Sequence, residues 1–105
     1  MMKMMMSAHV VEDRMERVMA IAQHIGWGVE LVSVEDRQHP NRQLVITTTG
    51  VLLVRGIGNK LITAYVPNVE KLAAIYHLAG YGRVPTNMYA RVKKNLQIMK
   101  RMGLV

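Results

Sequence analysis

Four short extended segments, separated by turns, lie in the middle of this 105-residue chain. Their residues are mostly β-branched or apolar, which favours strands. These segments are residues 29–34, 43–49, 51–55 and 61–66. The polar stretch 35–41 contains a proline, and the stretch 56–60 contains two glycines and an asparagine, so both are expected to be tight turns. Such short connections predict three or four antiparallel strands.

Helical periodicity is found on both sides of these strands. Before them, apolar residues recur at helical spacing, and Gly26 and Gly28 are expected to end that helix. The stripe consists of Val11, Met15, Val18, Ala22 and Ile25. After the strands, helices are predicted over 69–79 and 87–102, with Thr86 as a candidate cap of the second. The last helix has an apolar seam of Met88, Val92, Leu96, Met99 and Met102.

These patterns predict an α+β fold. An N-terminal helix packs on a three- to four-stranded antiparallel sheet, and two C-terminal helices follow. Because the strands are almost continuously apolar, at least one of them is expected to be covered on both faces.

Domain organisation follows from length and composition. Residues 1–6 form a methionine-rich leader that is expected to be disordered, and residues 7–105 form a single α+β domain with Ser7 as a candidate helix cap. Translation could equally begin at Met5 or Met6.

The opening segment is too short for a secretory signal, and no run of about 18 apolar residues exists, so we expect a cytoplasmic protein with no membrane partner. The absence of cysteine excludes disulfides, thiolate zinc sites and a cysteine nucleophile.

Charge is distributed unevenly along the chain. Residues 1–36 contain three basic and six acidic side chains, whereas residues 37–105 contain eleven basic side chains and one acid, Glu70. Lysines and arginines that neutralise phosphates release condensed counterions, so clustered positive charge predicts a polyanionic partner. Nucleic acid is the expected partner, and a basic protein with no such partner is the alternative. The candidate nucleic-acid-binding residues are Arg42, Arg55, Lys60, Arg91, Lys93, Lys94, Lys100 and Arg101.

His9 is the candidate catalytic residue at the start of the first helix. Asp13, four residues later, shares its helical face and could hold the imidazole in one tautomer. The same face also suits plain solvation. His9 and Asp13 supply only two ligands, which do not make a metal site, so no metal and no cofactor are expected. Arg14 and Arg17 lie beside this face, where they could bind a phosphate or form surface salt bridges.

Three segments resemble a known superfamily. Residues 7–17 (SAHVVEDRMER) resemble the SxHxxxR…R opening of small domains in the barnase–EndoU–colicin–RelE-like ribonuclease superfamily. Residues 59–65 (NKLITAY) are similar to its late strand, and residues 46–51 (ITTTGV) resemble the strand pair that precedes it. The resemblance covers residues 7–67, and the last two helices lie outside it.

The resemblance implies a metal-independent endoribonuclease, often the toxin of a toxin–antitoxin or polymorphic system, with a cognate inhibitor. RNA is therefore the expected nucleic acid, and DNA is the alternative. It implies that His9 is the general acid or base, that Arg14 stabilises the phosphorane charge, and that Thr63 orients a phosphate or the 2′-hydroxyl. The two helices that follow residue 67 could instead cover the face that RNA would need, which would leave a non-catalytic descendant.

A non-enzymatic role is the alternative to catalysis. The chain would then be a phage- or plasmid-type regulator that binds nucleic acid or a host protein, using adaptable methionine-rich surface. A homodimer paired through the apolar seam of the last helix is compatible with either role.

Overall fold

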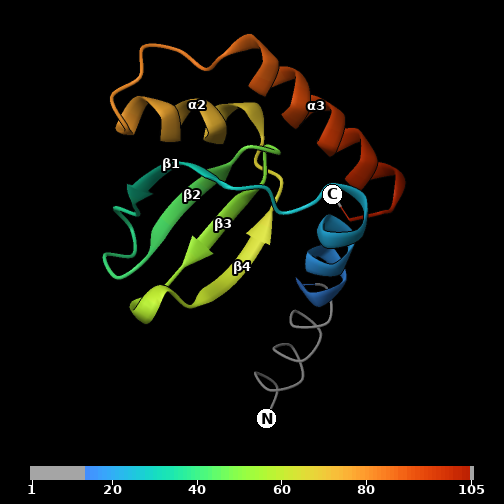
Figure 1. Cartoon of the computed structure of the whole chain (residues 1–105), viewed down its shortest axis with the longest axis horizontal. Helices are drawn as coiled ribbons and strands as arrows, with labels where there is room; N and C mark the ends of the chain where they lie inside the picture. The colour runs from blue at the N-terminus through green and yellow to red at the C-terminus, as the bar shows by residue number, and fades with distance from the viewer. Residues whose placement is uncertain (1–13, 105) are drawn as a thin grey trace.

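The computed structural model describes residues 14–104. One four-stranded antiparallel sheet, in the order β1-β2-β3-β4, lies at its centre (Figure 1). Its strands are β1 (Glu30–Glu35), β2 (Gln43–Thr47), β3 (Leu52–Arg55) and β4 (Leu61–Tyr65). Residues 14–24 are helical and precede the sheet, whereas α2 (Val69–Leu78) and α3 (Thr86–Arg101) follow it. The predicted α+β architecture is therefore confirmed.

The turns between strands form where the sequence predicts them. The β3–β4 connection contains the short 3₁₀ turn η1 (Ile57–Asn59), in which Gly58 and Asn59 have φ angles of 70° and 65°. Glycine and asparagine tolerate this left-handed conformation better than other residues. The Gly56 N–H donates to the carbonyl of Lys60 at 2.7 Å and closes the turn.

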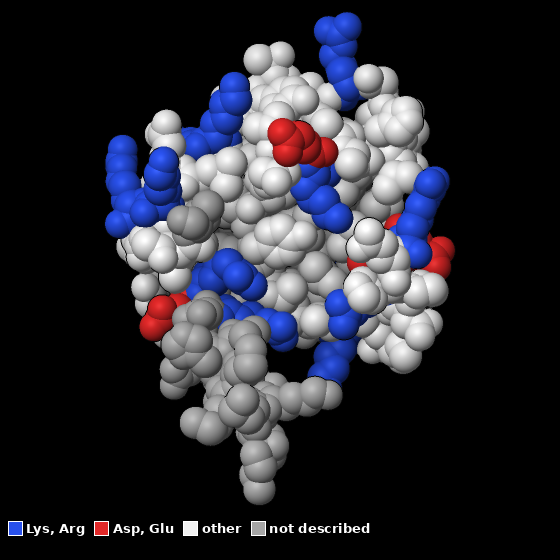
Figure 2. Space-filling model, turned by 180° about the vertical axis from the view of Figure 1, so that it is seen from behind, with Lys and Arg blue, Asp and Glu red and all other residues white. Residues whose placement is uncertain are grey.

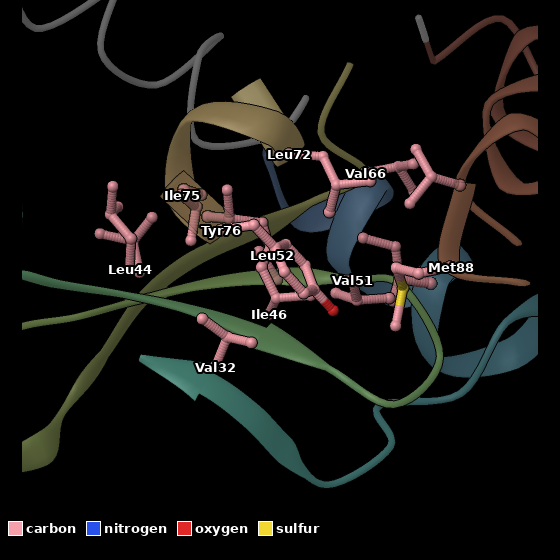
Figure 3. Packing of buried hydrophobic residues seen from close by; sticks show 14 of the residues in the cluster. Val32, Leu44, Ile46, Val51, Leu52, Val66, Leu72, Ile75, Tyr76 and Met88 are labelled. Atoms are coloured by element: carbon pink, nitrogen blue, oxygen red, sulfur yellow. The ribbon is translucent and has the colours of Figure 1, made fainter. Parts of the chain in front are cut away.

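Helix α2 covers one face of the sheet. Its Leu72, Ile75 and Tyr76 meet an apolar surface supplied by the strands (Figure 3). Those strand residues include Val32, Leu44, Ile46 and Leu52.

On the opposite face, Val45 of β2 is also fully buried. There Arg55 of β3 pairs with Glu30 of β1 at 2.7 Å. Because β2 lies between these two strands, the ion pair crosses it. Strand β2 is therefore covered on both faces, as its apolar sequence predicts.

The N-terminal helix buries a face that only partly overlaps the one its apolar stripe predicts. Met15 is 58% exposed and Ala22 is exposed, whereas Ala20 and Ile21 are buried. Arg17 lies on the buried side, one helical turn before Ala20 and Ile21. Its guanidinium is hydrogen-bonded to β4, so an arginine can face the sheet here. The predicted stripe is thus wrong at Met15 and Ala22, whereas Val18 and Ile25 pack against the core as predicted. Val11, Ser7 and the leader 1–6 lie outside the described residues.

The helix ends are partly as predicted. The N-terminal helix stops before Gly26, which has a φ of 87° and donates its N–H to the Ile21 carbonyl at 2.8 Å. Asn68 caps α2, because its Oδ1 accepts the Lys71 N–H at 2.7 Å. Thr86 is the first residue of α3 and does not cap it. Pro85 occupies the cap position and makes no side-chain cap hydrogen bond.

Helix α3 packs its apolar seam into the chain's own core. Met88, Val92 and Met99 are buried, Leu96 is partly buried, and only Met102 is substantially exposed, at 42%. Most of the surface expected to pair with a second copy is therefore already covered. Asn95 is buried on the same side, although a polar side chain would be expected at an exposed position.

Candidate nucleic-acid interface

Arg17 joins the N-terminal helix to β4. Its Nε donates to the main-chain oxygen of Ala64 at 3.2 Å, and its Nη2 donates to Thr63 Oγ1 at 3.2 Å. Its Cζ lies 5.9 Å from the centre of the Tyr65 ring, within the range of a cation–π interaction. Strand β4 is an edge strand, so the guanidinium satisfies a carbonyl and a hydroxyl at an open edge of the sheet.

The Tyr65 phenol is part of this cluster. Burial raises its pKa, Asp36 raises it further, and the positive charge of Arg17 opposes both effects. The hydroxyl is therefore a neutral hydrogen-bonding group at physiological pH. Thr63 Oγ1 accepts a hydrogen bond from Arg17, and its own hydroxyl proton stays available for another acceptor.

Arg14 and Thr63 line one shallow hollow of ≈ 260 Å³ between the N-terminal helix and β4. The structure therefore brings together two of the three predicted catalytic residues. The third, His9, lies outside the described residues. The other residues that line the hollow are apolar: Met15, Val18, Met19, Leu61 and Ile62. Arg17 was not singled out as catalytic, yet it makes the direct contact with Thr63. The sequence signal for its position is its spacing of three residues from Arg14, which places both side chains on the same side of the helix.

Helix α3 is fixed to the turn between β2 and β3 by two polar side chains. Asn95 Nδ2 donates to the carbonyl of Thr49 at 2.8 Å, and Arg91 Nη1 donates to the carbonyl of Thr48 at 2.6 Å. Gly50 sits beneath them with a φ of 86°, and a Cβ there would lie 3.2 Å from Asn95 Nδ2.

The same turn also holds the end of the N-terminal helix. Thr49 Oγ1 donates to the carbonyl of Gly26 at 2.8 Å and lies 3.0 Å from Thr47 Oγ1. These threonines, which the sequence presents as ordinary strand residues, connect three parts of the fold.

The outer face of α3 carries four of the predicted nucleic-acid-binding residues. These are Lys93, Lys94, Lys100 and Arg101, and all four are exposed. The helix contains no acidic residue over its sixteen positions. Arg91 is exposed as well, although one of its nitrogens is committed to Thr48. All the charged side chains on the outer face are therefore positive.

The remaining predicted binding residues lie at the end of the sheet opposite the β2–β3 turn, to which α3 is hydrogen-bonded. Arg42 and Lys60 line a hollow of ≈ 350 Å³ with Ile57 and Ile62 at the hairpin turns. The charge of Arg55 is largely neutralised by Glu30. This end is consequently less cationic than α3.

Ionic pairing leaves most of the positive charge free. Arg55–Glu30 is the only ion pair within residues 14–104. Figure 2 shows Lys and Arg side chains at several separate places around one face, with few acidic groups between them. None of the helices within residues 14–104 has the length and apolar composition of a membrane span, and no three His, Asp or Glu side chains there form a group that could hold a metal ion.

No protein-family model, curated protein or solved structure matches this chain. The ribonuclease resemblance therefore stays a prediction.

Proposed function

We propose that this protein binds nucleic acid through the outer face of α3. The observation that carries the proposal is the four exposed cations on a sixteen-residue helix without any acid. A solvated helix usually alternates charges of both signs, which form i, i+4 pairs. Helix α3 has no such partners, so its cations are available for phosphates.

The chemistry of such binding is counterion release. Each phosphate neutralised by a lysine or arginine frees condensed cations, so affinity falls steeply as salt rises. If all four side chains contact phosphates of a duplex, the slope of log affinity against log salt is about −3.6. This contribution does not depend on base sequence.

The test is fluorescence anisotropy with labelled oligonucleotides over a range of salt concentrations. Replacing Lys93, Lys94, Lys100 and Arg101 together with glutamine is expected to lower affinity at least about a hundredfold at 0.1 M salt. A matched control removes four cations elsewhere, by glutamine substitution at Arg37, Arg42, Lys60 and Lys71. The proposal requires the control to bind much more tightly than the α3 variant. Equal losses in the two variants would contradict it, and circular dichroism checks that both are folded.

Endoribonuclease activity at the junction of the N-terminal helix and β4 is the second candidate. The observation that favours it is the hydrogen bond from the Arg17 guanidinium to the Thr63 hydroxyl, together with the hollow that Thr63 and Arg14 both line. Fixed positive charge beside a hydroxyl suits stabilisation of a phosphorane. The proposed roles are His9 as general acid or base, Arg14 as the charge stabiliser, and Thr63 as the group that orients a phosphate or the 2′-hydroxyl.

A cleavage assay on labelled RNA without added metal tests this candidate. Wild type is expected to leave 2′,3′-cyclic phosphate ends, and His9→Ala is expected to lower the rate by about 10² or more. Equal rates in wild type and His9→Ala, or no cleavage by either, would remove the enzymatic role and leave the binding proposal intact.

A further inference from the structure

The cations on α3 are arranged in two rows. At 3.6 residues per turn, Lys93 and Lys100 lie on one side of the outer face, and Lys94 and Arg101 lie on the other. Within each row the two residues are seven positions apart, about 10 Å along the axis.

A strip of uncharged residues separates the two rows of cations. Thr86, Ala90 and Gln97 fall midway between them at helical spacing, and all three are exposed. The most protruding line of the helix is therefore uncharged, with positive charge along both flanks.

We infer that α3 enters the major groove of B-form DNA with this neutral strip facing the bases. The inference rests on the proposed function and names its nucleic acid. The major groove is about 12 Å wide and admits a helix, whose diameter with side chains is about 10–12 Å. In that position, each row faces the phosphates of one strand, and Gln97 can form hydrogen bonds with base edges.

Other nucleic acids fit this face less well. The major groove of duplex RNA is deep and narrow, and side chains cannot reach its bases. Single strands are usually held by aromatic side chains that stack on bases. The exposed positions of α3 include no aromatic residue, because its only aromatic residue, Tyr89, is half-buried. The two rows of cations also match the two phosphate backbones that border a duplex groove, whereas a single strand offers only one flexible backbone.

The arrangement of the fold leaves this helix accessible. Helix α3 lies at the periphery of the molecule, and its inner side packs toward the core (Figure 1). The hydrogen bonds of Asn95 and Arg91 to the β2–β3 turn hold it rigidly from beneath. A helix held in this way enters a groove without losing further conformational freedom.

The first experiment compares the two rows. Anisotropy measures binding of the full chain to a 20-base-pair DNA duplex, the RNA duplex of the same sequence, and each single strand. The variants are Lys93→Gln/Lys100→Gln and Lys94→Gln/Arg101→Gln, with Arg37→Gln/Lys71→Gln as a control of equal charge. Each row variant is expected to flatten the salt slope on duplex DNA by about two, and the control much less. If only one of the two row variants changed the binding of duplex DNA, the helix would not lie between two phosphate backbones, and the inference would be overturned.

The second experiment changes shape without changing charge. Ala90→Tyr enlarges the neutral strip, and is expected to weaken binding to duplex DNA about tenfold while leaving single-strand binding undiminished. Ala74→Tyr, at an exposed position of α2, is the matched control. Duplexes carrying glucosylated hydroxymethylcytosine, whose sugar fills the major groove, should bind wild type about tenfold more weakly than unmodified DNA.

The outcomes separate this inference from the proposed function. No binding to any nucleic acid, or no loss on removing all four cations, overturns both. Salt-dependent binding that is equal for DNA and RNA duplexes, or indifferent to Ala90→Tyr and to the filled groove, overturns the inference alone. Preference for duplex DNA, together with equal dependence on both rows and sensitivity to the blocked groove, supports it.

Discussion

The junction of the N-terminal helix with β4 and the outer face of α3 are both cationic, yet their charges have different roles. Arg17 is half-buried, donates to Ala64 and Thr63, and lies against the Tyr65 ring. Lys93 and Lys94 are exposed and make no hydrogen bond or ion pair within residues 14–104. One region uses positive charge to assemble the fold, whereas the other leaves it available to a partner.

This difference shows that net charge alone is a poor guide to a binding surface. A guanidinium already bonded to main-chain oxygen has fewer donors left for a phosphate, and removing it costs stability. An exposed lysine on a helix contributes little to stability and much to affinity for a polyanion. Substitutions in the two regions should therefore separate stability from binding.

The largest expected effect on stability is at the attachment of α3. Gly50→Ala places a Cβ in a left-handed conformation and 3.2 Å from both Asn95 Nδ2 and Val92 Cγ2. We expect the free energy of unfolding to fall by about 3 kcal/mol, combining backbone strain with overpacking. Urea unfolding measures it. Gly82→Ala is the control, because a Cβ there meets nothing within 4 Å. Similar small effects at both glycines would show that α3 is not held rigidly.

The next effect tests the structural role of Arg17. Arg17→Met keeps the aliphatic stem but removes both hydrogen bonds, and is expected to lower the free energy of unfolding by about 2 kcal/mol. Lys94→Met on α3 should change it by less than about 0.5 kcal/mol. Urea unfolding and the salt-dependent binding assay are applied to both variants. If Lys94→Met destabilised the chain more than Arg17→Met, the contrast between the two regions would be wrong.

The arrangement of strands could be predicted because it depends on local information. Segments rich in β-branched residues alternate with short turns, and the Gly58-Asn59 pair suits the left-handed conformation that its turn requires. Consecutive strands joined by short turns pair antiparallel. The two C-terminal helices are likewise visible from their periodicity and from proline and glycine at their ends.

The polar contacts that join these elements could not be predicted in the same way. Arg17 faces β4 because the edge strand offers an oxygen, which no helical pattern reveals. Asn95 occupies a core position because the Thr49 carbonyl needs a donor. Each contact joins residues more than forty positions apart, so its partner is known only once the chain has folded.

The smallest expected effect on the free energy of unfolding involves Tyr65 at the junction of the N-terminal helix with β4, and it appears only at alkaline pH. Burial and Asp36 raise its pKa above the usual value of 10.0, while Arg17 lowers it. The folded chain then holds the phenol proton more tightly than the unfolded chain, so this contribution to stability is complete below pH 10.0 and is lost as pH rises through the folded-state pKa.

Tyr65→Phe should therefore make the decline of unfolding free energy above pH 10 shallower than in wild type. Arg17→Met should raise the Tyr65 pKa further, because it removes the one charge that favours the phenolate. Absorbance of the phenolate, recorded as the difference between each chain and its Tyr65→Phe counterpart, measures this shift. A lower Tyr65 pKa in Arg17→Met would mean that Arg17 does not act electrostatically on the ring, and that its role at the junction is only to hold the main chain of β4.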